Sequence, residues 1–116
     1  MVRALSGEAM LARVFIGEDD LWHGRPLATA LLERLRREGF AGATVFHGVA
    51  GFGANSVLHT SSILRLSEDL PVVLEIVDEE ARMPALEAIL EEMVSEGLTT
   101  LERVRVIRYS PDQPAV

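Results

Sequence analysis

The order of apolar segments predicts an α+β fold with four strands and two helices in one domain. Runs rich in branched side chains alternate with segments of helical spacing, in the order strand, helix, strand, long loop, strand, helix, strand. The two halves echo each other, because Glu38-Gly39-Phe40 and Glu96-Gly97-Leu98 each end a predicted helix and lead into a strand. Two interleaved right-handed crossover units of this kind predict a ferredoxin-like βαββαβ fold, a four-stranded antiparallel sheet with both helices on one face.

The first half of the chain contains two predicted strands around one helix. Met10 to Gly17 is a short apolar run rich in branched and aromatic residues, which is typical of a strand. A helix is expected over about Pro26 to Glu38, because Pro26 suits a first helical turn and Gly39 supplies a stop. Ala43 to His47 is again strand-like. The apolar residues that recur at helical spacing are Leu27, Ala30, Leu31 and Leu35.

The second half repeats this order after a long loop, predicted over residues 48–69. The run Val72 to Val77 is the strongest strand signal in the chain. A helix follows from about Glu80 to Glu96, with Gly97 as its stop, and Leu101 to Tyr109 forms the last strand. The apolar stripe of the second helix consists of Met83, Leu86, Ile89, Leu90, Met93 and Val94.

Length and composition limit the classes of protein and of site. The 116 residues suffice for one domain, predicted over residues 10–109 with tails at 1–9 and 110–116. The chain lacks cysteine, which excludes thiol nucleophiles and thiolate metal sites, and it lacks lysine, which excludes Schiff-base chemistry. Its net charge of −7 argues against a nucleic-acid partner. We expect a cytoplasmic protein, because no segment resembles a secretory signal or a membrane anchor.

The predicted sheet is apolar on both sides. In the third predicted strand, Val73, Glu75 and Val77 alternate with a second set, Val72, Leu74 and Ile76. Helices on one face leave the other face uncovered, so we expect a partner subunit to bury it and the protein to form a homo-oligomer.

A glycine-rich stretch opens the long loop. Gly48, Gly51 and Gly53 would let the backbone approach a ligand or form a nest of amides for an anion. The GxxGxG spacing is the reverse of the dinucleotide-binding GxGxxG, and it leads into a loop instead of a helix. The alternative is that these glycines serve loop geometry alone.

Basic residues in two places suggest an anionic ligand. Residues 49–65 contain no acidic side chain but carry His59 and Arg65. Arg103 and Arg105 share one face of the last predicted strand, whereas Arg108 lies on the other. The alternative is that these arginines are paired with carboxylates or solvated.

Other chemistry has weaker support in the sequence. No GxSxG nucleophile motif is present, and the three histidines, His23, His47 and His59, are too far apart for a helical metal pair. A metal site assembled between subunits stays open, whereas residues 18–20 form an acidic turn that favours solvation. Glu75 and His47 are the candidates for an enzymatic acid or base, and both are more simply explained by subunit contact or by the loop edge.

Several short motifs between Leu11 and Tyr109 together resemble one family. Their combination is similar to the domain of unknown function 190 family, a branch of the PII-like signalling proteins. The resemblance implies a ferredoxin-like subunit, a trimer with its bare sheet faces turned inward and a flexible loop after the second strand. Some relatives in this family are encoded near ion channels or exporters, or are fused to them. The resemblance therefore implies a membrane transporter or channel as partner. The motifs are Val14-Phe15-Ile16-Gly17-Glu18, Gly39-Phe40-Ala41-Gly42-Ala43-Thr44-Val45, Gly48 with Gly51-Phe52-Gly53, Ile63-Leu64-Arg65-Leu66-Ser67, Asp69-Leu70-Pro71-Val72-Val73, Val77-Asp78 and Gly97-Leu98-Thr99-Thr100.

The resemblance also implies where a ligand would bind. PII proteins proper hold adenine nucleotides in clefts between subunits, at the base of the long loop, the turn after the second helix and basic residues of the last strand. The chain departs from these proteins in two ways. Its turn after the second predicted helix lacks the glycine-rich signature with lysine. Its only tyrosine, Tyr109, lies outside the loop, so no uridylylation is expected. The matching positions are Gly48, Gly51, Gly53, Gly97, Thr99, Arg103 and Arg105.

Three functions follow as hypotheses. The first is a trimeric, non-enzymatic sensor that needs no cofactor, binds a small anionic effector such as an adenine nucleotide and reports through residues 48–69, with His59 and Arg65 as further ligand contacts. The second is a trimeric divalent-cation-binding protein that resembles the cation-tolerance family. The third is a small enzyme with a ferredoxin-like fold.

Overall fold

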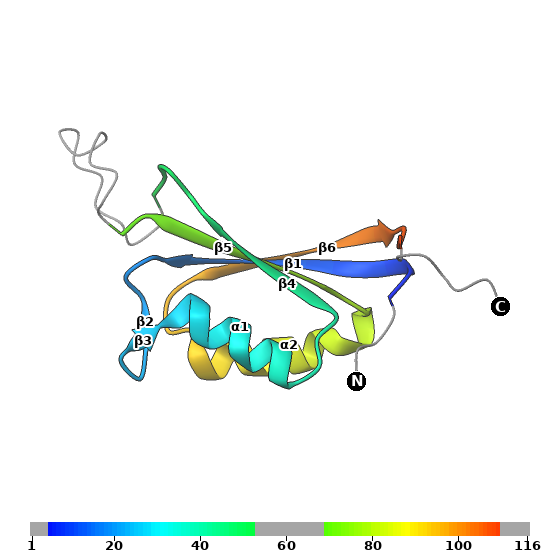
Figure 1. The fold of residues 1–116 in the computed structure, drawn as a ribbon, viewed down its shortest axis with the longest axis horizontal. Coiled ribbons are helices and arrows are strands. Elements are labelled where there is room, and N and C mark those ends of the chain that lie inside the picture. The colour runs from blue at the N-terminus through cyan, green and yellow to red at the C-terminus, as the bar shows by residue number, and fades with distance from the viewer. Residues whose placement is uncertain (1–4, 53–68, 110–116) are drawn as a thin grey trace.

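The computed structural model describes residues 5–52 and 69–109 and confirms the ferredoxin-like α+β fold (Figure 1). Its main sheet has the strand order β4-β5-β1-β6, and every neighbouring pair is antiparallel. Each crossover therefore skips one strand, as interleaved βαβ units require. The four strands are β1 (Gly7–Gly17), β4 (Gly42–His47), β5 (Pro71–Asp78) and β6 (Leu98–Val106).

Both helices cover the same face of the sheet, and the opposite face is bare (Figure 1). α1 spans Leu27–Arg37, and α2 spans Met83–Met93 after the short 3-10 helix η2 (Glu80–Arg82). All four predicted apolar positions of α1 are buried, as are five of the six predicted for α2, and Val94 packs partly buried against them. The side chains that these helices cover on the sheet are Met10, Ala12, Val14, Ile16, Val72, Leu74 and Ile76.

Gly39 ends α1 as the sequence predicts. Its φ is +78°, a left-handed conformation that glycine adopts without a steric penalty. The Gly39 N–H donates to Arg36 O at 3.1 Å, and the Phe40 N–H donates to Leu35 O at 3.0 Å. This pair of hydrogen bonds is the Schellman motif, which satisfies carbonyl groups that the helix leaves free at its end.

The predicted stop at Gly97 is wrong, because α2 ends at Met93 instead of Glu96. Val94, at the C-cap, already has an extended backbone with φ −101° and ψ 115°. Gly97 instead permits a close approach to β1, since a Cβ there would lie 2.8 Å from Phe15 O. β6 consequently starts at Leu98 and ends at Val106, three residues before the predicted bounds at both ends.

A short hairpin between β1 and α1 was not predicted. It pairs β2 (Leu21–Trp22) with β3 (Arg25–Pro26). The two residues of its turn, His23 and Gly24, have φ of 50° and 79°, as a type I′ turn requires. The hairpin was missed because His-Gly is an uncommon type I′ pair. Pro26 therefore lies at the N-cap of α1 and not inside its first turn, and β1 begins at Gly7, inside the predicted tail.

The bare face carries an ion cluster at its centre. Arg13 Nε lies 2.9 Å from Glu75 Oε2, and the Arg13 guanidinium also pairs with Glu102. These hydrogen bonds, with Glu75 first and Glu102 second, raise the pKa of Arg13. Around the cluster the face is apolar and open to solvent, with Phe46 50% and Leu98 61% exposed.

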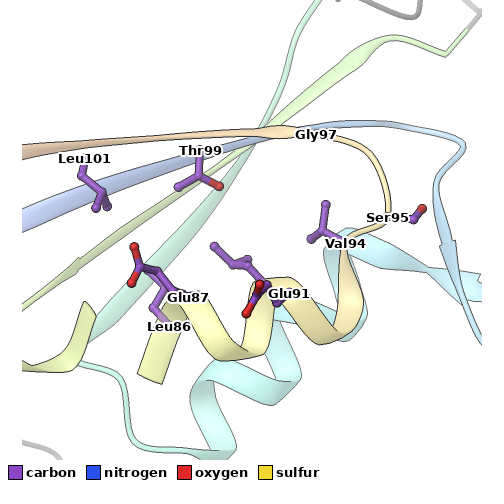
Figure 2. Close-up of a pocket in the computed structure, with 9 residues that line it drawn as sticks. Leu86, Glu87, Glu91, Val94, Ser95, Gly97, Thr99 and Leu101 are labelled. Carbon is purple, nitrogen blue, oxygen red and sulfur yellow. The ribbon is translucent and has the colours of Figure 1, made fainter. Parts of the chain in front are cut away.

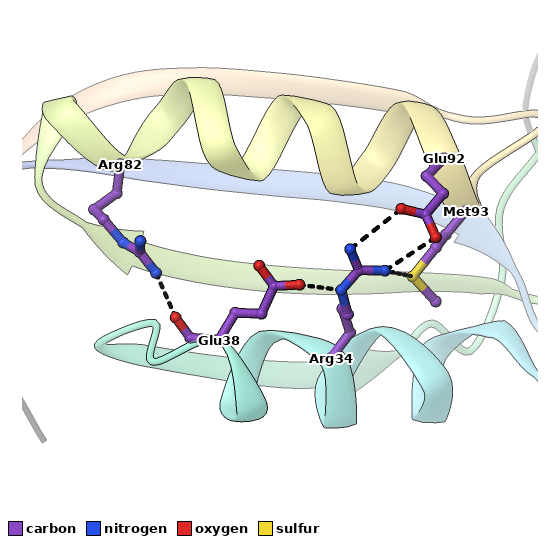
Figure 3. Close-up of polar contacts among 5 residues, drawn as sticks. All are labelled: Arg34, Glu38, Arg82, Glu92 and Met93. Carbon is purple, nitrogen blue, oxygen red and sulfur yellow. Dashed lines mark hydrogen bonds and ion pairs between the residues drawn. The ribbon is translucent and has the colours of Figure 1, made fainter. Parts of the chain in front are cut away.

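The two helices are joined by arginine side chains (Figure 3). Arg34 of α1 donates to both carboxylate oxygens of Glu92 on α2, at 3.1 and 3.2 Å, and also binds Glu38. Arg82 Nη2 donates to Glu38 O at 2.7 Å, and its guanidinium carbon lies 4.2 Å from the centre of the Phe40 ring.

Asp78 anchors the same end of the domain. Its side chain is fully buried at the end of β5. The carboxylate accepts hydrogen bonds from Ala41 N at 3.0 Å and Glu79 N at 2.7 Å, and Arg82 Nε lies 3.7 Å away. Asp78 therefore ties the turn between α1 and β4 to the start of η2.

Candidate ligand-binding site

The first group of predicted ligand residues follows the end of β4. The Gly48 N–H donates to Pro71 O at 2.7 Å, so the chain stays beside β5 after β4 ends. A Cβ on Gly48 would lie 2.7 Å from Pro71 Cγ, and one on Gly51 would lie 3.0 Å from the same atom. The packing against Pro71 therefore requires glycine at position 48, and at Gly51 it leaves little room for a side chain. This observation supports the loop-geometry interpretation without excluding contact with a ligand.

Asp69 connects the other end of the loop to the turn after β1. Its carboxylate accepts a hydrogen bond from Asp19 N at 3.0 Å, and Glu18 N donates to Leu70 O at 2.8 Å. Asp69 has a φ of +37°, which places it in the left-handed region. Across the same end of the sheet, His47 Nδ1 lies 3.9 Å from Glu18 Oε2. The start of the long loop is thus held against the start of β5, and its end is held against the turn after β1.

The second group lies at the start of β6. Gly97 and Thr99 line a groove of about 480 Å³ between β6 and α2 (Figure 2). We call it the acidic groove, because Glu87 and Glu91 stand on its α2 side. These two carboxylates were not predicted as part of a site, although their i, i+4 spacing places them on one side of the helix. An anion bound at Gly97 and Thr99 would meet their repulsion within a single chain. The remaining lining residues are Leu86, Leu90, Val94, Ser95 and Leu101.

Arg103 and Arg105 share one face of β6, as predicted. This face is the helix-facing one, because their cross-strand partners are Met10 and Glu8. Arg103 is already paired, since its Nη1 and Nη2 lie 3.0 and 2.9 Å from the two carboxylate oxygens of Glu80. The hydrogen bonds that Arg103 donates to Glu80 raise the pKa of Arg103. Within the described ranges no salt bridge reaches Arg105, so its charge is the more available of the two.

One chain does not bring the predicted residues together. Gly48 and Gly51 follow the edge strand β4, whereas Gly97 and Thr99 lie at the opposite edge, on or next to β6. Three strand spacings, about 14 Å, separate the two edges. Along β6, Thr99 and Arg105 lie about 20 Å apart, at 3.4 Å per residue. The predicted residues Gly53, His59 and Arg65 lie outside the described residues.

In residues 5–52 and 69–109, no group of three or more His, Asp or Glu side chains could hold a metal ion. Among the helices that the structure describes, neither is long and apolar enough to span a bilayer.

Comparison of the sequence with protein families gives one match over most of the chain. Residues 9–106 match the DUF190 family, described as "Uncharacterized ACR, COG1993". The chain belongs to the DUF190 family. It is 41% identical over 99 residues to a UPF0166 protein of Aquifex aeolicus (84% of this chain, 91% of the relative) and 32% identical over 102 residues to UPF0166 protein MJ1524 of Methanocaldococcus jannaschii (87% and 94%).

Solved structures match the fold of this DUF190 member. CPII from Thiomonas intermedia K12, bound to ADP, AMP and acetate, superposes with a TM-score of 0.64 at 12% identity, covering 90% of this chain and 94% of CPII. The apo form of CPII, a nitrogen regulatory PII-like protein, gives a TM-score of 0.61 at 12% identity, covering 88% and 95%. At this identity the match concerns the fold, and it confirms the PII-like architecture that the sequence motifs predict.

Proposed function

We propose that this chain is the subunit of a trimeric, non-enzymatic regulatory protein that binds a small anionic effector, an adenine nucleotide, in clefts between subunits. The observation that carries the proposal is the division of the predicted ligand residues between β4 and β6. Two groups at opposite edges of one sheet can form one site only if a second chain supplies half of it. CPII, which shares the fold, is bound to ADP and AMP.

The bare face of the sheet supports the oligomer. Phe46, Leu98 and their neighbours expose an apolar surface that helices of the same chain do not cover. Large exposed apolar patches mark interaction sites. In the trimer this face turns inward, where the cluster of Arg13, Glu75 and Glu102 retains its internal ion pairs.

The effector would act by favouring one arrangement of residues 48–69, whose two ends adjoin the cleft. A conformational change in that segment would then reach a partner protein, a membrane transporter or ion channel, from the cytoplasmic side. Arg105 is the residue we assign to the effector's phosphate, because its guanidinium has no salt bridge among the residues described and phosphate accepts charge-assisted hydrogen bonds from arginine. Since Arg105 lies about 20 Å along β6 from Thr99, the nucleotide would lie extended along this strand between the two residues.

Titration calorimetry with ATP, ADP and AMP tests this proposal. We expect saturable binding by the wild type and about 10- to 150-fold weaker binding by Arg105→Ala, since a hydrogen bond to a charged group contributes roughly 1.5–3 kcal/mol. Arg37→Ala, which removes an exposed arginine from α1, is the matched control and should bind as the wild type does.

Absence of heat with all three nucleotides would contradict the nucleotide part of the proposal. A thermal-shift series with divalent metals extends the test, because a ligand that binds the folded state raises the melting temperature. A shift with metal alone would favour the cation-binding hypothesis instead.

A further inference from the structure

The charges at the centre of the bare face do not cancel. Arg13 lies on β1, between Glu75 on β5 and Glu102 on β6. Its Nε lies 2.9 Å from Glu75 Oε2, and its Nη1 pairs with a carboxylate oxygen of Glu102. One guanidinium thus serves two carboxylates, which leaves one negative charge in excess on each copy.

The residues around this cluster do not balance the excess. Thr44 of β4 lies opposite Glu75, and Thr100 of β6 lies opposite Arg13. Every other residue that the four strands place on this face is apolar, a glycine or a threonine. Within residues 5–52 and 69–109, the sheet therefore directs no further titratable group toward the cluster.

Solvent tolerates the excess charge in a single chain. The side chains of Arg13, Glu75 and Glu102 are 38%, 32% and 53% exposed, so water reaches all three. Contact between bare faces removes this water, and burial strongly disfavours a charge without a counterion. Two carboxylates that share one site also repel each other, which favours the protonated form of one of them.

The excess does not depend on how the copies are arranged around the axis. A trimer brings together three guanidinium groups and six carboxylates of this kind, because its subunits are identical. Pairing between copies can replace pairing within one copy, but it leaves the sum of the charges unchanged. Three negative charges therefore remain to be neutralised at the contact.

We infer that Glu75 and Glu102 of each subunit take up one proton between them when the bare faces meet, so that the trimer assembles more strongly as the pH falls. The inference rests on the proposed trimer and adds a means of regulating its assembly. The proton comes from solvent and neutralises one carboxylate. The other carboxylate then remains as the single counterion of Arg13, which balances the charge of the buried cluster.

The uptake gives the pH dependence a direction and a size. Above about pH 5 an exposed glutamate is ionised, so each proton must be bound during assembly. Three protons enter one trimer, and the association constant therefore falls by up to about 1000-fold for each unit that the pH rises. The concentration at which half of the protein is assembled follows the square root of this constant and rises by up to about 30-fold.

Glu102→Gln tests the inference, because its neutral amide replaces the protonated carboxyl. We expect this variant to lose most of the pH dependence and to assemble at a lower concentration than the wild type at pH 8. Glu96→Gln is the matched control, since it removes the same charge from an exposed turn between α2 and β6 and should behave as the wild type does. Histidines titrate in the same range, but all of them remain in both variants.

Light scattering over dilution series between pH 5.5 and pH 8.5 gives the readout. Equal pH dependence in the wild type and Glu102→Gln, or a wild-type trimer that does not respond to pH, overturns the proton uptake and leaves the trimer intact. Assembly that follows the concentration of sodium or potassium ions in place of pH also overturns it, in favour of a bound cation. A wild-type monomer at every pH overturns the inference and the proposed trimer together.

Infrared spectroscopy at pH 7 tests the same proton directly, even in a trimer that survives every dilution. We expect the carbonyl stretch of a protonated carboxylic acid in the wild type and in Glu96→Gln, and its loss in Glu102→Gln. A wild-type trimer without this band overturns the inference. Calorimetry on the same samples decides separately whether nucleotide binds.

Discussion

The two faces of β5 have similar sequences but opposite environments. Val72, Leu74 and Ile76 are almost completely buried under the helices, whereas Val73 and Val77 on the other face are only half-buried. The side chains on both faces of β5 are mainly apolar. Side-chain hydrophobicity alone therefore does not decide which face becomes the core. The crossover helices decide it, because right-handed connections place both helices on one side.

The comparison teaches that the two faces have different tasks. The covered face supplies the stability of the single chain through close packing. The bare face keeps an apolar surface with a charged centre, Arg13 with Glu75 and Glu102, and in the proposed trimer this surface turns toward the other copies. Substitutions on the covered face should therefore change the free energy of unfolding, and those on the bare face should mainly change assembly.

Leu74→Ala should give the largest effect. Leu74 is fully buried, and its truncation leaves a cavity that costs about 2–5 kcal/mol of unfolding free energy. Chemical denaturation measures this loss. Val73→Ala, one residue away on the bare face, is the matched control and should lose much less. Equal losses of unfolding free energy in Leu74→Ala and Val73→Ala would show that the two faces of β5 contribute equally to stability.

A matched pair of carboxylates gives an intermediate effect. Asp78→Asn should lower the free energy of unfolding by about 1–3 kcal/mol, because the amide cannot replace both acceptor oxygens for Ala41 N and Glu79 N in a fully buried place. Glu75→Gln, on the bare face, should cost less, because Glu75 is partly exposed and water can replace its contact with Arg13. Melting temperatures of the two variants measure this difference. A larger loss in Glu75→Gln than in Asp78→Asn would show that the bare face is the more tightly packed.

The smallest effect is a pH dependence from exposed pairs of the helix layer. The hydrogen bond from Arg34 lowers the pKa of Glu92 from its ordinary value of 4.5 (Figure 3). The hydrogen bond from Arg25 lowers the pKa of Glu33 in the same way. Because the pKa is lower in the folded state, the stabilisation is complete above pH 4.5 and is lost as the pH falls through the lower folded pKa.

Melting temperatures between pH 7 and pH 3 measure this dependence. Arg34→Met should remove the contribution of Glu92 and flatten the acid limb, whereas Arg37→Met should leave the curve as in the wild type. An acid limb in Arg34→Met as steep as that of the wild type would assign the acid sensitivity to other carboxylates.

Much of the fold could be predicted from local patterns. The apolar positions of α1, the stop at Gly39 and the strand at Val72 to Val77 depend on periodicity and on glycine's backbone freedom, which operate within a few residues. The end of α2 could not be predicted, because Gly97 was needed for a contact with Phe15 O across the sheet and not as a helix stop. The hairpin at His23 was not predicted, because His-Gly is an uncommon residue pair in type I′ turns.

The sequence alone determined the fold class, the family and the residue types available for binding, because these depend on periodicity, composition and short motifs. The tertiary structure decided which of these residues can act together. It divided Gly48 from Gly97 between the two edges of the sheet, paired Arg103 with Glu80 and brought Arg13, Glu75 and Glu102 together on the bare face. Contacts between side chains far apart in the sequence set these neighbours, and such contacts are not encoded in the spacing of residues along the chain.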